Sequence, residues 1–425
     1  MRGAEIYMLK IAFLMPGEIL EYQELEKIIL SKYNVANEVL EEASDLLGID
    51  VKEYCKEDNL EKLTNLKNIH PLILTLSVAS FMVCKRVYGI EPAYAAGYSL
   101  GEITALTCSG MITFKDAIKI VETRQKLIEE ALSDDYYGMV LKSRKNASNI
   151  ESIYNELQLK DMGIYLTHYN SPNEIVITGE KSALQKAVDK FKGIKIKTIP
   201  LKINSPLHTP LMDKVATKFK KELSKYTFRD ESFPVISNVY GLPYRGKASI
   251  VENLSRQITA SVKWTETMKF LENKRVKKVV MATPSSLLKG LLGNHYNIRG
   301  LSFDNSKDLF FIKNMRDEVK MREAIPLTGR ALGIIACTKN SNWDEEEYKE
   351  GVMKPYSIIS EMNERLESEK RYPSEEEMLE IIDLMKLIFK TKKLPIKEQK
   401  ERFQDLIDGS EINDELKEMI MLNCL

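Results

Sequence analysis

Short apolar runs alternate with helical segments over the first third of the chain, and this alternation restricts the possible folds more than any other feature. Ile11 to Met15 is long enough for one buried strand, and Ala93 to Tyr98 for another. Between them, PLILTLSVASFMVCKR begins at Pro71 and is apolar on almost every side, so we expect a helix that is buried on most faces. This alternation is typical of an α/β domain built on a mostly parallel sheet.

The order of elements changes between Tyr136 and about Leu201. The patterns predict, in order, a strand at 136–142, a helix at 146–158, strands at 163–170 and 174–179, a helix at 181–191 and a strand at 196–201. The order β-α-β-β-α-β is typical of a ferredoxin-like unit. We therefore predict an insert at 136–205 within a larger domain of residues 9–135 and 206–305. Strands at 233–239, 277–282 and 299–303 complete that domain.

Residues 306–425 have a different composition and are expected to form a helical C-terminal extension. Long, charged, amphipathic segments predict helices at 344–367, 374–390 and 397–407, with a last one near Glu415. We interpret their charge runs as solvated helix faces, because an amphipathic helix needs a polar side.

Composition excludes several classes of protein. Lys plus Arg and Asp plus Glu both total 62, and no basic segment has interleaved aromatic residues, so we expect no affinity for nucleic acid or for a membrane. The cysteines are odd in number and form no C-x-x-C pair, which argues against a disulfide framework and a zinc site; they are Cys55, Cys84, Cys108, Cys337 and Cys424. Pro16 and Gly17 break the N-terminal apolar stretch, so we expect neither a signal peptide nor a membrane span. A reduced, cytoplasmic protein is the expectation.

The segment GYSLGE at 97–102 contains the pattern G-x-S-x-G directly after the second predicted strand. A tight turn between a strand and a helix would expose the hydroxyl of Ser99 beside the first N–H groups of the helix. Ser99 is thus a candidate nucleophile, although the same pattern also surrounds serines without chemical function.

A serine nucleophile needs a base, and the chain has four histidines: His70, His168, His208 and His295. His208 follows the insert in the loop INSPLHTPLM, from which a side chain can point into a cleft between the two domains. The alternative is a histidine that is hydrogen-bonded within its own loop.

Arg124 lies in the apolar stripe of a helix that is predicted to begin near Thr113. A buried guanidinium needs an anionic partner, because an unpaired buried charge is strongly destabilising. The partner is either a structural Asp or Glu, or the carboxylate of a substrate held by two parallel hydrogen bonds.

Five segments resemble, in the same order, the malonyl-CoA:acyl-carrier-protein transacylase family, which includes the stand-alone acyltransferases of trans-acyltransferase polyketide synthases. They are GYSLGE at 97–102, RQKLIEE from Arg124, YNSPNEIVITG at 169–179, SPLHTPLM at 205–212 and VKWTETMKFL at 262–271. The resemblance covers about residues 9–305. It implies an α/β-hydrolase-like catalytic domain that carries a ferredoxin-like insert, in agreement with the segmentation above.

By resemblance, Ser99 attacks the thioester of malonyl-CoA and His208 takes its proton. A malonyl ester forms on Ser99, and the phosphopantetheine thiol of an acyl carrier protein then removes the malonyl group in a ping-pong cycle. Arg124 matches the arginine that binds the malonyl carboxylate. The family needs no metal and no cofactor apart from CoA, which enters as the thioester substrate.

The resemblance also assigns supporting positions. The N–H groups of Leu100 and Glu18 would form the oxyanion hole, and the backbone carbonyl of Ala260 or Ser261 would orient the histidine. His168 and His295 are expected to be structural, because neither falls on a functional position of the family.

Several positions depart from the family pattern. Tyr98 replaces the histidine of GHSLGE, Glu18 replaces the glutamine of PGQG, and His70 stands where a glutamine before proline is usual. The family's glycine-rich GPG segment is also lost, since the chain reads MATPSSLLKG there. An ionised Glu18 would oppose a nearby oxyanion, so it must point away, pair with a cation such as protonated His70, or stay protonated. In the family, a large side chain just before the base goes with malonyl and a small one with branched acyl groups, so the resemblance implies malonyl for Leu207.

The carrier protein is expected to be acidic, so a basic rim should flank the cleft. Candidate residues are Lys190, Lys192, Lys195, Lys197, Lys218, Lys220 and Lys221, although scattered surface lysines are the alternative. Polyketide synthase modules are further possible partners, and the carrier can belong to fatty acid or polyketide synthesis. Two rival functions are an acyl-carrier-protein thioester hydrolase and a non-catalytic scaffold that binds carrier protein.

Overall fold

The computed structural model describes residues 10–17, 32–55, 69–131, 135–143, 150–192, 194, 196–201, 205–283, 286–293, 295–302, 305, 307–313, 327–369, 371 and 373–408. The chain divides into two compact units between Met315 and Arg316. We predicted a boundary at residue 306. The division falls later, because residues 307–313 form a further helix of the first unit.

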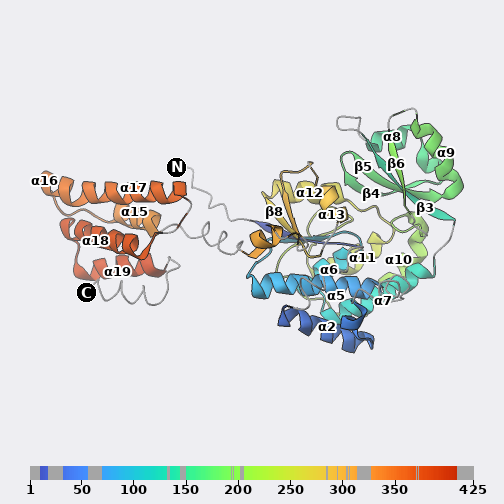
Figure 1. Ribbon diagram of the computed structural model, residues 1–425, viewed down its shortest axis with the longest axis horizontal. Coiled ribbons are helices and arrows are strands. Elements are labelled where there is room, and N and C mark those ends of the chain that lie inside the picture. The colour runs from blue at the N-terminus through green and yellow to red at the C-terminus, as the bar shows by residue number, and fades with distance from the viewer. Residues whose placement is uncertain are drawn as a thin grey trace. The chain divides into compact units, whose positions relative to one another are not determined.

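A five-stranded parallel sheet forms the centre of the first unit (Figure 1). Its strands, in the spatial order β7-β2-β1-β8-β9, are Val235–Ile236, Tyr94–Gly97, Ile11–Met15, Lys278–Met281 and Arg299–Ser302. All neighbouring pairs are parallel. The central strand β1 is buried along its whole length, as expected in a sheet that is covered on both faces. The prediction of a parallel sheet is confirmed.

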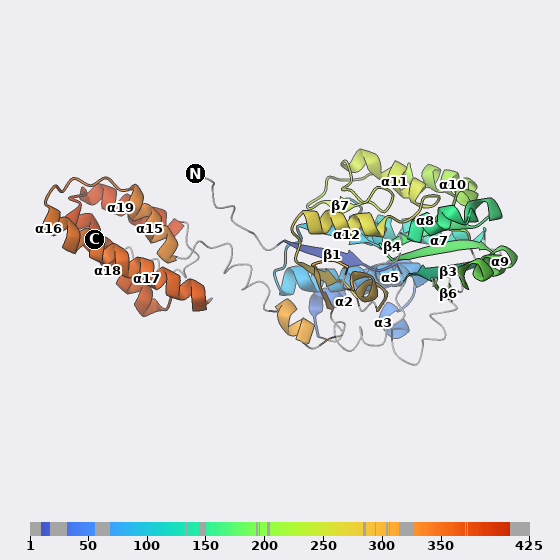
Figure 2. The ribbon, with the colours of Figure 1, turned by 90° about the horizontal axis from the view of Figure 1, so that it is seen from above.

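Helices cover both faces of this sheet, and Figures 1 and 2 show α5 and α12 on opposite sides of it. One layer contains α5 (Ile69–Met82) and α6 (Gly101–Cys108), with α2 (Asn34–Leu47) and α7 (Phe114–Glu129) against α5. The other layer contains α12 (Trp264–Asn273) and α13 (Ser286–Leu292). Alternate residues of β1 face the two layers. Leu14 packs with α12 and α13, whereas Phe13 packs edge to face on Phe81 of α5, with 5.1 Å between the ring centroids.

Helix α5 continues through a π-helical turn, Val83–Val87. The stretch Ile69–Val87 is long and apolar enough to cross a membrane by length and composition alone, but 72% of its most apolar window is buried inside the unit. The prediction of a core helix that is buried on most sides is thus confirmed. Outside the insert, this unit also contains α3 (Val51–Tyr54), α10 (Asp213–Leu223) and α11 (Ile250–Gln257), with 3₁₀ turns at Pro210–Met212 and Lys247–Ser249.

The insert forms a separate antiparallel sheet, whose helices lie at one end of the first unit in both views (Figures 1 and 2). Along the chain its elements are β3 (Tyr136–Lys142), α8 (Ile150–Glu156), a 3₁₀ turn (Leu159–Met162), β4 (Tyr165–Ser171), β5 (Glu174–Glu180), α9 (Lys181–Lys192) and β6 (Lys197–Leu201). The spatial order of the strands is β4-β5-β3-β6. Both helices share one apolar cluster with the sheet.

Main-chain hydrogen bonds join the edge strand β4 to the segment between α11 and α12. The N–H of Tyr169 donates to the carbonyl of Val262, and the N–H of Val262 donates to the carbonyl of Thr167, both at 2.9 Å. These bonds use groups that an edge strand leaves unpaired within its own sheet. They fix His168, which lies between the two bonded residues, against the larger domain.

The second unit is helical, as predicted. Its described elements are α15 (Leu327–Cys337), α16 (Glu345–Tyr348), a π-helical turn (Lys349–Met353), α17 (Lys354–Glu369), α18 (Glu375–Thr391) and α19 (Ile396–Asp408). Four of these helices, α15, α17, α18 and α19, share one apolar core. The sequence analysis did not predict α15, and the helix predicted near Glu415 lies outside the described residues.

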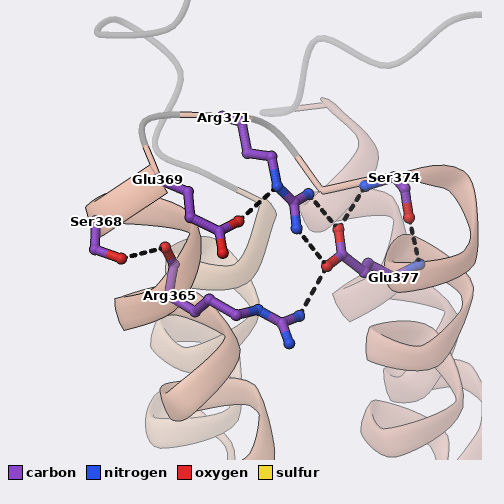
Figure 3. A network of polar contacts seen from close by, with 6 residues as sticks. All are labelled: Arg365, Ser368, Glu369, Arg371, Ser374 and Glu377. Carbon is purple, nitrogen blue, oxygen red and sulfur yellow. Dashed lines mark hydrogen bonds and ion pairs between the residues drawn. The ribbon is translucent and has the colours of Figure 1, made fainter.

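A polar network connects α17 to the start of α18 (Figure 3). The carboxylate of Glu377 accepts hydrogen bonds from Arg365 at 2.8 Å and from Arg371 at 2.7 Å. Glu377 and Ser374 also form a capping box, in which each side chain accepts from the other residue's N–H group. Arg371 first, and then the N–H of Ser374, hold the pKa of Glu377 down at about 2. The network therefore fixes the residue at which α18 begins.

Candidate active site

Ser99 lies on a sharp turn between β2 and α6, at the carboxyl end of the parallel sheet. Its φ of 52° is in the left-handed region, which is strained for a serine. The flanking glycines permit this turn. A Cβ on Gly97 would lie 1.8 Å from the carbonyl carbon of Gly101, and a Cβ on Gly101 would lie 2.1 Å from the carbonyl oxygen of Met15. The predicted strand–serine–helix turn is confirmed.

His208 contacts this serine. The distance from Ser99 Oγ to His208 Nε2 is 2.8 Å, and His208 Nδ1 donates to the main-chain carbonyl of Gln257 at 2.8 Å. Because a carbonyl oxygen only accepts, Nδ1 carries the proton and Nε2 is left to accept from the serine hydroxyl. Burial and then the charge of Arg124 lower the pKa of His208 to about 3. The imidazole is therefore neutral at pH 7 and can take a proton.

The carbonyl that orients His208 is not the residue that we predicted. The prediction of a main-chain carbonyl was correct, but the hydrogen bond goes to Gln257, not to Ala260 or Ser261. Gln257 is the last residue of α11. The last carbonyl groups of a helix accept no hydrogen bond within it, so the carbonyl of Gln257 is available to His208. Ala260 gives the ring only a weaker favourable interaction, and the hydroxyl of Ser261 donates to the carbonyl of Leu166 instead.

Arg124 is on α7, where its side chain is almost fully buried at 2% exposure. Its Nη2 lies 3.3 Å from Ser99 Oγ and 3.3 Å from Gln257 Oε1, while its Nε has no hydrogen-bond partner. Within the described residues, no carboxylate lies within ion-pair distance of the guanidinium, so the alternative of a structural Asp or Glu partner finds no support there. Burial lowers the pKa of Arg124 to about 10 and the charge of Glu102 opposes the shift, so the group is charged at pH 7.

Three residues that the sequence analysis did not assign fix the main chain of Ser99 through hydrogen bonds: Asn238, Gln257 and Glu102. Asn238 Oδ1 accepts from the N–H of Ser99 at 2.8 Å, and Gln257 Nε2 donates to the carbonyl of Ser99 at 2.9 Å. Both Asn238 and Gln257 are in turn hydrogen-bonded to the buried carboxylate of Glu102. The one sequence signal was Glu102 itself, a single charged residue in the otherwise uncharged helix at 101–106.

His168, which we expected to be structural, packs directly on the base. Its ring lies 5.0 Å from the ring of His208, in a T-shaped arrangement, and stacks on Tyr98 at 5.2 Å with 6° between the ring planes. Burial first, and then His208, hold the pKa of His168 well below its usual value. Tyr98 also packs on Trp264 and donates from its hydroxyl to Asn170 Oδ1 at 2.7 Å. The substitution at Tyr98 thus supplies a stacking surface beside the base.

The predicted oxyanion-hole residues are only partly described. Leu100 directly follows Ser99 at the N-terminus of α6, where N–H groups have no acceptor within the helix. The N–H of Ser99 is already bonded to Asn238 and is not available. Glu18 lies outside the described residues, although its neighbour Gly17 lies against the serine turn, since a Cβ there would be 2.3 Å from the carbonyl oxygen of Tyr98.

His70 and Leu207, which we predicted to line the substrate site, are both half-buried. His70 Nδ1 is a buried atom without a hydrogen-bond partner. Burial and then the charge of Arg124 lower the pKa of His70 to about 3. His70 is therefore neutral at pH 7, and Glu18, the residue with which its protonated form was expected to pair, lies outside the described residues. Leu207 directly precedes the base. His295 makes an edge-to-face ring contact with Tyr296, outside the group of residues around Ser99.

Comparison with known proteins agrees with this geometry. The family of acyl transferase domains matches residues 24–299. A malonyl CoA-acyl carrier protein transacylase from Bacillus subtilis is 30% identical over 397 residues, which are 92% of this chain and 99% of that protein. One from Salmonella typhimurium is 32% identical over 285 residues, which are 67% of this chain and 92% of that protein. The longer alignment must include part of the C-terminal helical unit.

Solved structures give the same result. An acyl carrier protein S-malonyltransferase from Vibrio cholerae superposes with a TM-score of 0.66 at 29% identity, over 72% of this chain and 100% of that chain. A malonyl-transacylase in complex with its type II polyketide synthase acyl-carrier protein gives a TM-score of 0.65 at 29% identity, over 72% and 99%. The family match over residues 24–299, together with a relative that is 30% identical over 92% of this chain, shows that the chain belongs to the family of acyl transferase domains.

Proposed function

We propose that this chain transfers a malonyl group from malonyl-CoA to the phosphopantetheine thiol of an acyl carrier protein, through a malonyl ester of Ser99. One observation carries the proposal. A serine hydroxyl that is bonded to a neutral imidazole lies 3.3 Å from the charged, buried guanidinium of Arg124, and no carboxylate pairs with that guanidinium among the described residues. The relatives named malonyl CoA-acyl carrier protein transacylase, and the malonyl-transacylase solved with its acyl-carrier protein, support the two substrates.

In the first half-reaction, Ser99 Oγ forms a bond to the thioester carbonyl carbon while His208 Nε2 takes the hydroxyl proton. The tetrahedral intermediate then expels the CoA sulfur, which receives that proton from His208. The hydrogen bond from Nδ1 to the carbonyl of Gln257 stabilises the positively charged ring between these steps. The N–H of Leu100 is one donor to the oxyanion, and the N–H of Glu18 is the second by resemblance.

In the second half-reaction, the thiol of the carrier protein attacks the malonyl ester. His208 takes the thiol proton and returns it to Ser99 Oγ as the ester bond breaks. Arg124 binds the free malonyl carboxylate in both halves. These steps use no metal and no cofactor beyond the CoA thioester. If water replaced the thiol, the product would be free malonate, which is the hydrolase alternative.

Neutral acyl groups would leave the buried charge of Arg124 without a partner, so the site should select acyl groups that carry a carboxylate. By resemblance, the large side chain of Leu207 next to the base favours malonyl over branched analogues. Tyr98 and His70 are the other lining residues that we propose. We place this activity in the cytoplasm, with no nucleic-acid or membrane partner.

The finer fold description also belongs to this proposal. The parallel sheet with helices on both faces, and the serine turn at the carboxyl end of β2, support an α/β-hydrolase-like domain. The strand order β4-β5-β3-β6, with both helices on one face, supports a ferredoxin-like insert.

The contacts of the candidate lysines narrow the surface that would bind the carrier protein. Lys218 and Lys220 form ion pairs with Glu130 and Glu252, which makes them weaker candidates for an acidic partner. Lys190 donates to a main-chain carbonyl of the insert. The side chains of Lys192 and Lys195 lie outside the described residues. Among the described candidates, Lys197 and Lys221 have no such ion pair or hydrogen bond of their side chains, which makes them better candidates than Lys190, Lys218 and Lys220.

Incubation with radiolabelled malonyl-CoA tests the proposal. We expect a labelled enzyme that passes its label to added acyl carrier protein, and no label on Ser99→Ala. Free malonate at high turnover would support the hydrolase instead. An unlabelled wild-type enzyme would contradict the proposed function and favour the non-catalytic scaffold.

A further inference from the structure

The carboxylate of Glu102 is fully buried beneath the serine turn, at 0% exposure. It accepts hydrogen bonds from the N–H of Asn238 at 3.0 Å, from the hydroxyl of Tyr244 at 2.6 Å and from Gln257 Nε2. No lysine or arginine lies within ion-pair distance of it among the described residues. A buried carboxylate that is held only by neutral donors is costly to ionise, so its presence calls for a reason other than stability.

Two residues that are hydrogen-bonded to Glu102, Asn238 and Gln257, are also hydrogen-bonded to the main chain of the nucleophile Ser99. Asn238 accepts from the N–H of Ser99 and donates from Nδ2 to the carbonyl of Gly97 at 2.6 Å. Gln257 donates to the carbonyl of Ser99. The peptide groups on both sides of Ser99 are therefore fixed by residues that are anchored on Glu102. A φ of 52° at a serine persists only where the surroundings determine it in this way.

Glu102 also fixes which way the side-chain amide of Gln257 points. An ionised carboxylate only accepts, so it requires the NH₂ end of that amide, and the oxygen end is left for Arg124 at 3.3 Å. The main-chain carbonyl of the same Gln257 orients His208. One carboxylate thus connects the nucleophile, the base and the cation that we propose binds the substrate carboxylate.

We propose that Glu102 is a positioning residue of this active site, and that only its ionised form holds Ser99, Gln257 and Arg124 in the reactive arrangement. The role of Arg124 towards a substrate carboxylate rests on the proposed function, whereas the effect of Glu102 on Ser99 does not. A proton on the carboxyl oxygen that Gln257 Nε2 contacts would face another donor, so that bond would be lost. On the other oxygen the proton could be accepted only by the hydroxyl of Tyr244, which would then stop donating to Glu102. The turn would relax, and the amide of Gln257 could rotate its NH₂ end towards the guanidinium.

The pH range of this effect follows from burial. Desolvation raises the pKa of Glu102 to about 7, and the bonds from Tyr244, Gln257, Asn238 and, least of all, Ser237 oppose the shift. The titratable and charged groups that face it are the hydroxyl of Tyr244, which stays protonated, and the guanidinium of Arg124. Activity should therefore fall as the pH drops through about 7. His208 cannot be the source of this loss, because its own pKa is near 3.

The contribution of Glu102 to the free energy of unfolding should change with pH in the opposite direction to the activity. An unfolded glutamate ionises near pH 4.5, whereas the folded one ionises near 7. The folded state therefore binds more protons between these values, and this contribution to stability is lost as the pH rises from 4.5 to 7. At pH 6 the wild-type protein should still keep part of this contribution, which is absent at pH 8, and yet be less reactive than at pH 8. Acid unfolding cannot produce that combination.

The test compares the wild type with Glu102→Gln, Tyr244→Phe and the matched control Glu252→Gln between about pH 5.5 and 8.5. Glu252 is an exposed glutamate on α11, the helix that carries Gln257. Two rates are measured on the full chain: formation of malonyl-Ser99 from malonyl-CoA, and modification of Ser99 by phenylmethylsulfonyl fluoride. The second rate reports on the nucleophile without any assumption about the substrate.

We expect both wild-type rates to decrease when the pH drops under about 7. The control Glu252→Gln should show the same rates and the same pH dependence as the wild type. Glu102→Gln should be about 10- to 100-fold slower at pH 8 and nearly independent of pH. Tyr244→Phe keeps the carboxylate but removes a donor to its charged form, so its midpoint should move to higher pH even if Glu102→Gln does not fold. The inference is overturned if the acid loss persists in Glu102→Gln, or if Tyr244→Phe leaves the midpoint unchanged. A wild type that reacts with the sulfonyl fluoride but not with malonyl-CoA would contradict the proposed function alone.

Discussion

Replacement of Arg124 by alanine should abolish the preference for acyl groups that carry a carboxylate. The guanidinium is 2% exposed and charged at pH 7, and no described carboxylate pairs with it, so a bound neutral acyl group leaves it uncompensated. Such a buried, unpaired charge costs about 3 to 5 kcal/mol. This is a factor of more than about 100 in kcat/KM between malonyl-CoA and acetyl-CoA for the wild-type enzyme.

The assay is the kcat/KM of the loading half-reaction for both thioesters, reported as a ratio. Arg124 also bonds to Ser99 and lowers the pKa of His208, so its loss will change the rate for every substrate. The ratio removes this shared effect. We expect it to fall from more than about 100 to about 1 in Arg124→Ala.

Two further variants sharpen the result. Arg124→Lys keeps a charge but loses the planar pair of donors, so it should have an intermediate ratio. Arg256→Ala removes an exposed arginine from the neighbouring helix α11 and should leave the ratio unchanged. If Arg124→Ala kept most of the malonyl preference, the assignment of the buried charge to the substrate carboxylate would be refuted.

Three other changes test separate parts of the structure. Gly97→Ala places a methyl group 1.8 Å from main-chain atoms of Gly101, so we expect little folded protein by circular dichroism, and a normally stable variant would contradict the turn geometry. His168→Ala removes a ring that packs on His208 and should slow Ser99 labelling, whereas His168→Phe keeps the ring and should retain most of the rate; equal effects would show that the stacking surface is unimportant. Glu377→Ala removes a capping box and should destabilise the C-terminal unit by about 1 kcal/mol, measured by hydrogen exchange in α18. Because the folded pKa of Glu377 is depressed, this difference should be present above about pH 4.5 and disappear as the pH falls towards about 2; a difference that is independent of pH would contradict it.

The sequence was a good guide where a periodic pattern or a local motif carries the information. The buried strand at 11–15 and the strand at 136–142 were predicted with the observed bounds, because apolar runs and alternation are local properties. Ser99, His208 and Arg124 were each found from a local signal, and the structure brings them within 3.3 Å of one another along a chain of contacts.

The supporting residues could not be predicted in the same way. Glu102, Asn238 and Gln257 come from segments up to 155 residues apart, and a hydrogen bond between a buried amide and a carboxylate has no sequence period. The position of His168 depends on a main-chain bridge between an edge strand and a loop of the other sheet's domain. The helix α15 was missed because its apolar residues are interrupted by two glycines, which lower helix propensity.

The most direct test of the central claim is mass spectrometry of the acyl-enzyme that forms from an equimolar mixture of malonyl-, methylmalonyl- and acetyl-CoA. The account predicts a malonyl ester on the peptide that contains Ser99, in large excess over the acetyl ester, and no acyl group on that peptide in His208→Ala over the same time. An acetyl ester in comparable amount, or a malonyl group on any other residue, would contradict it.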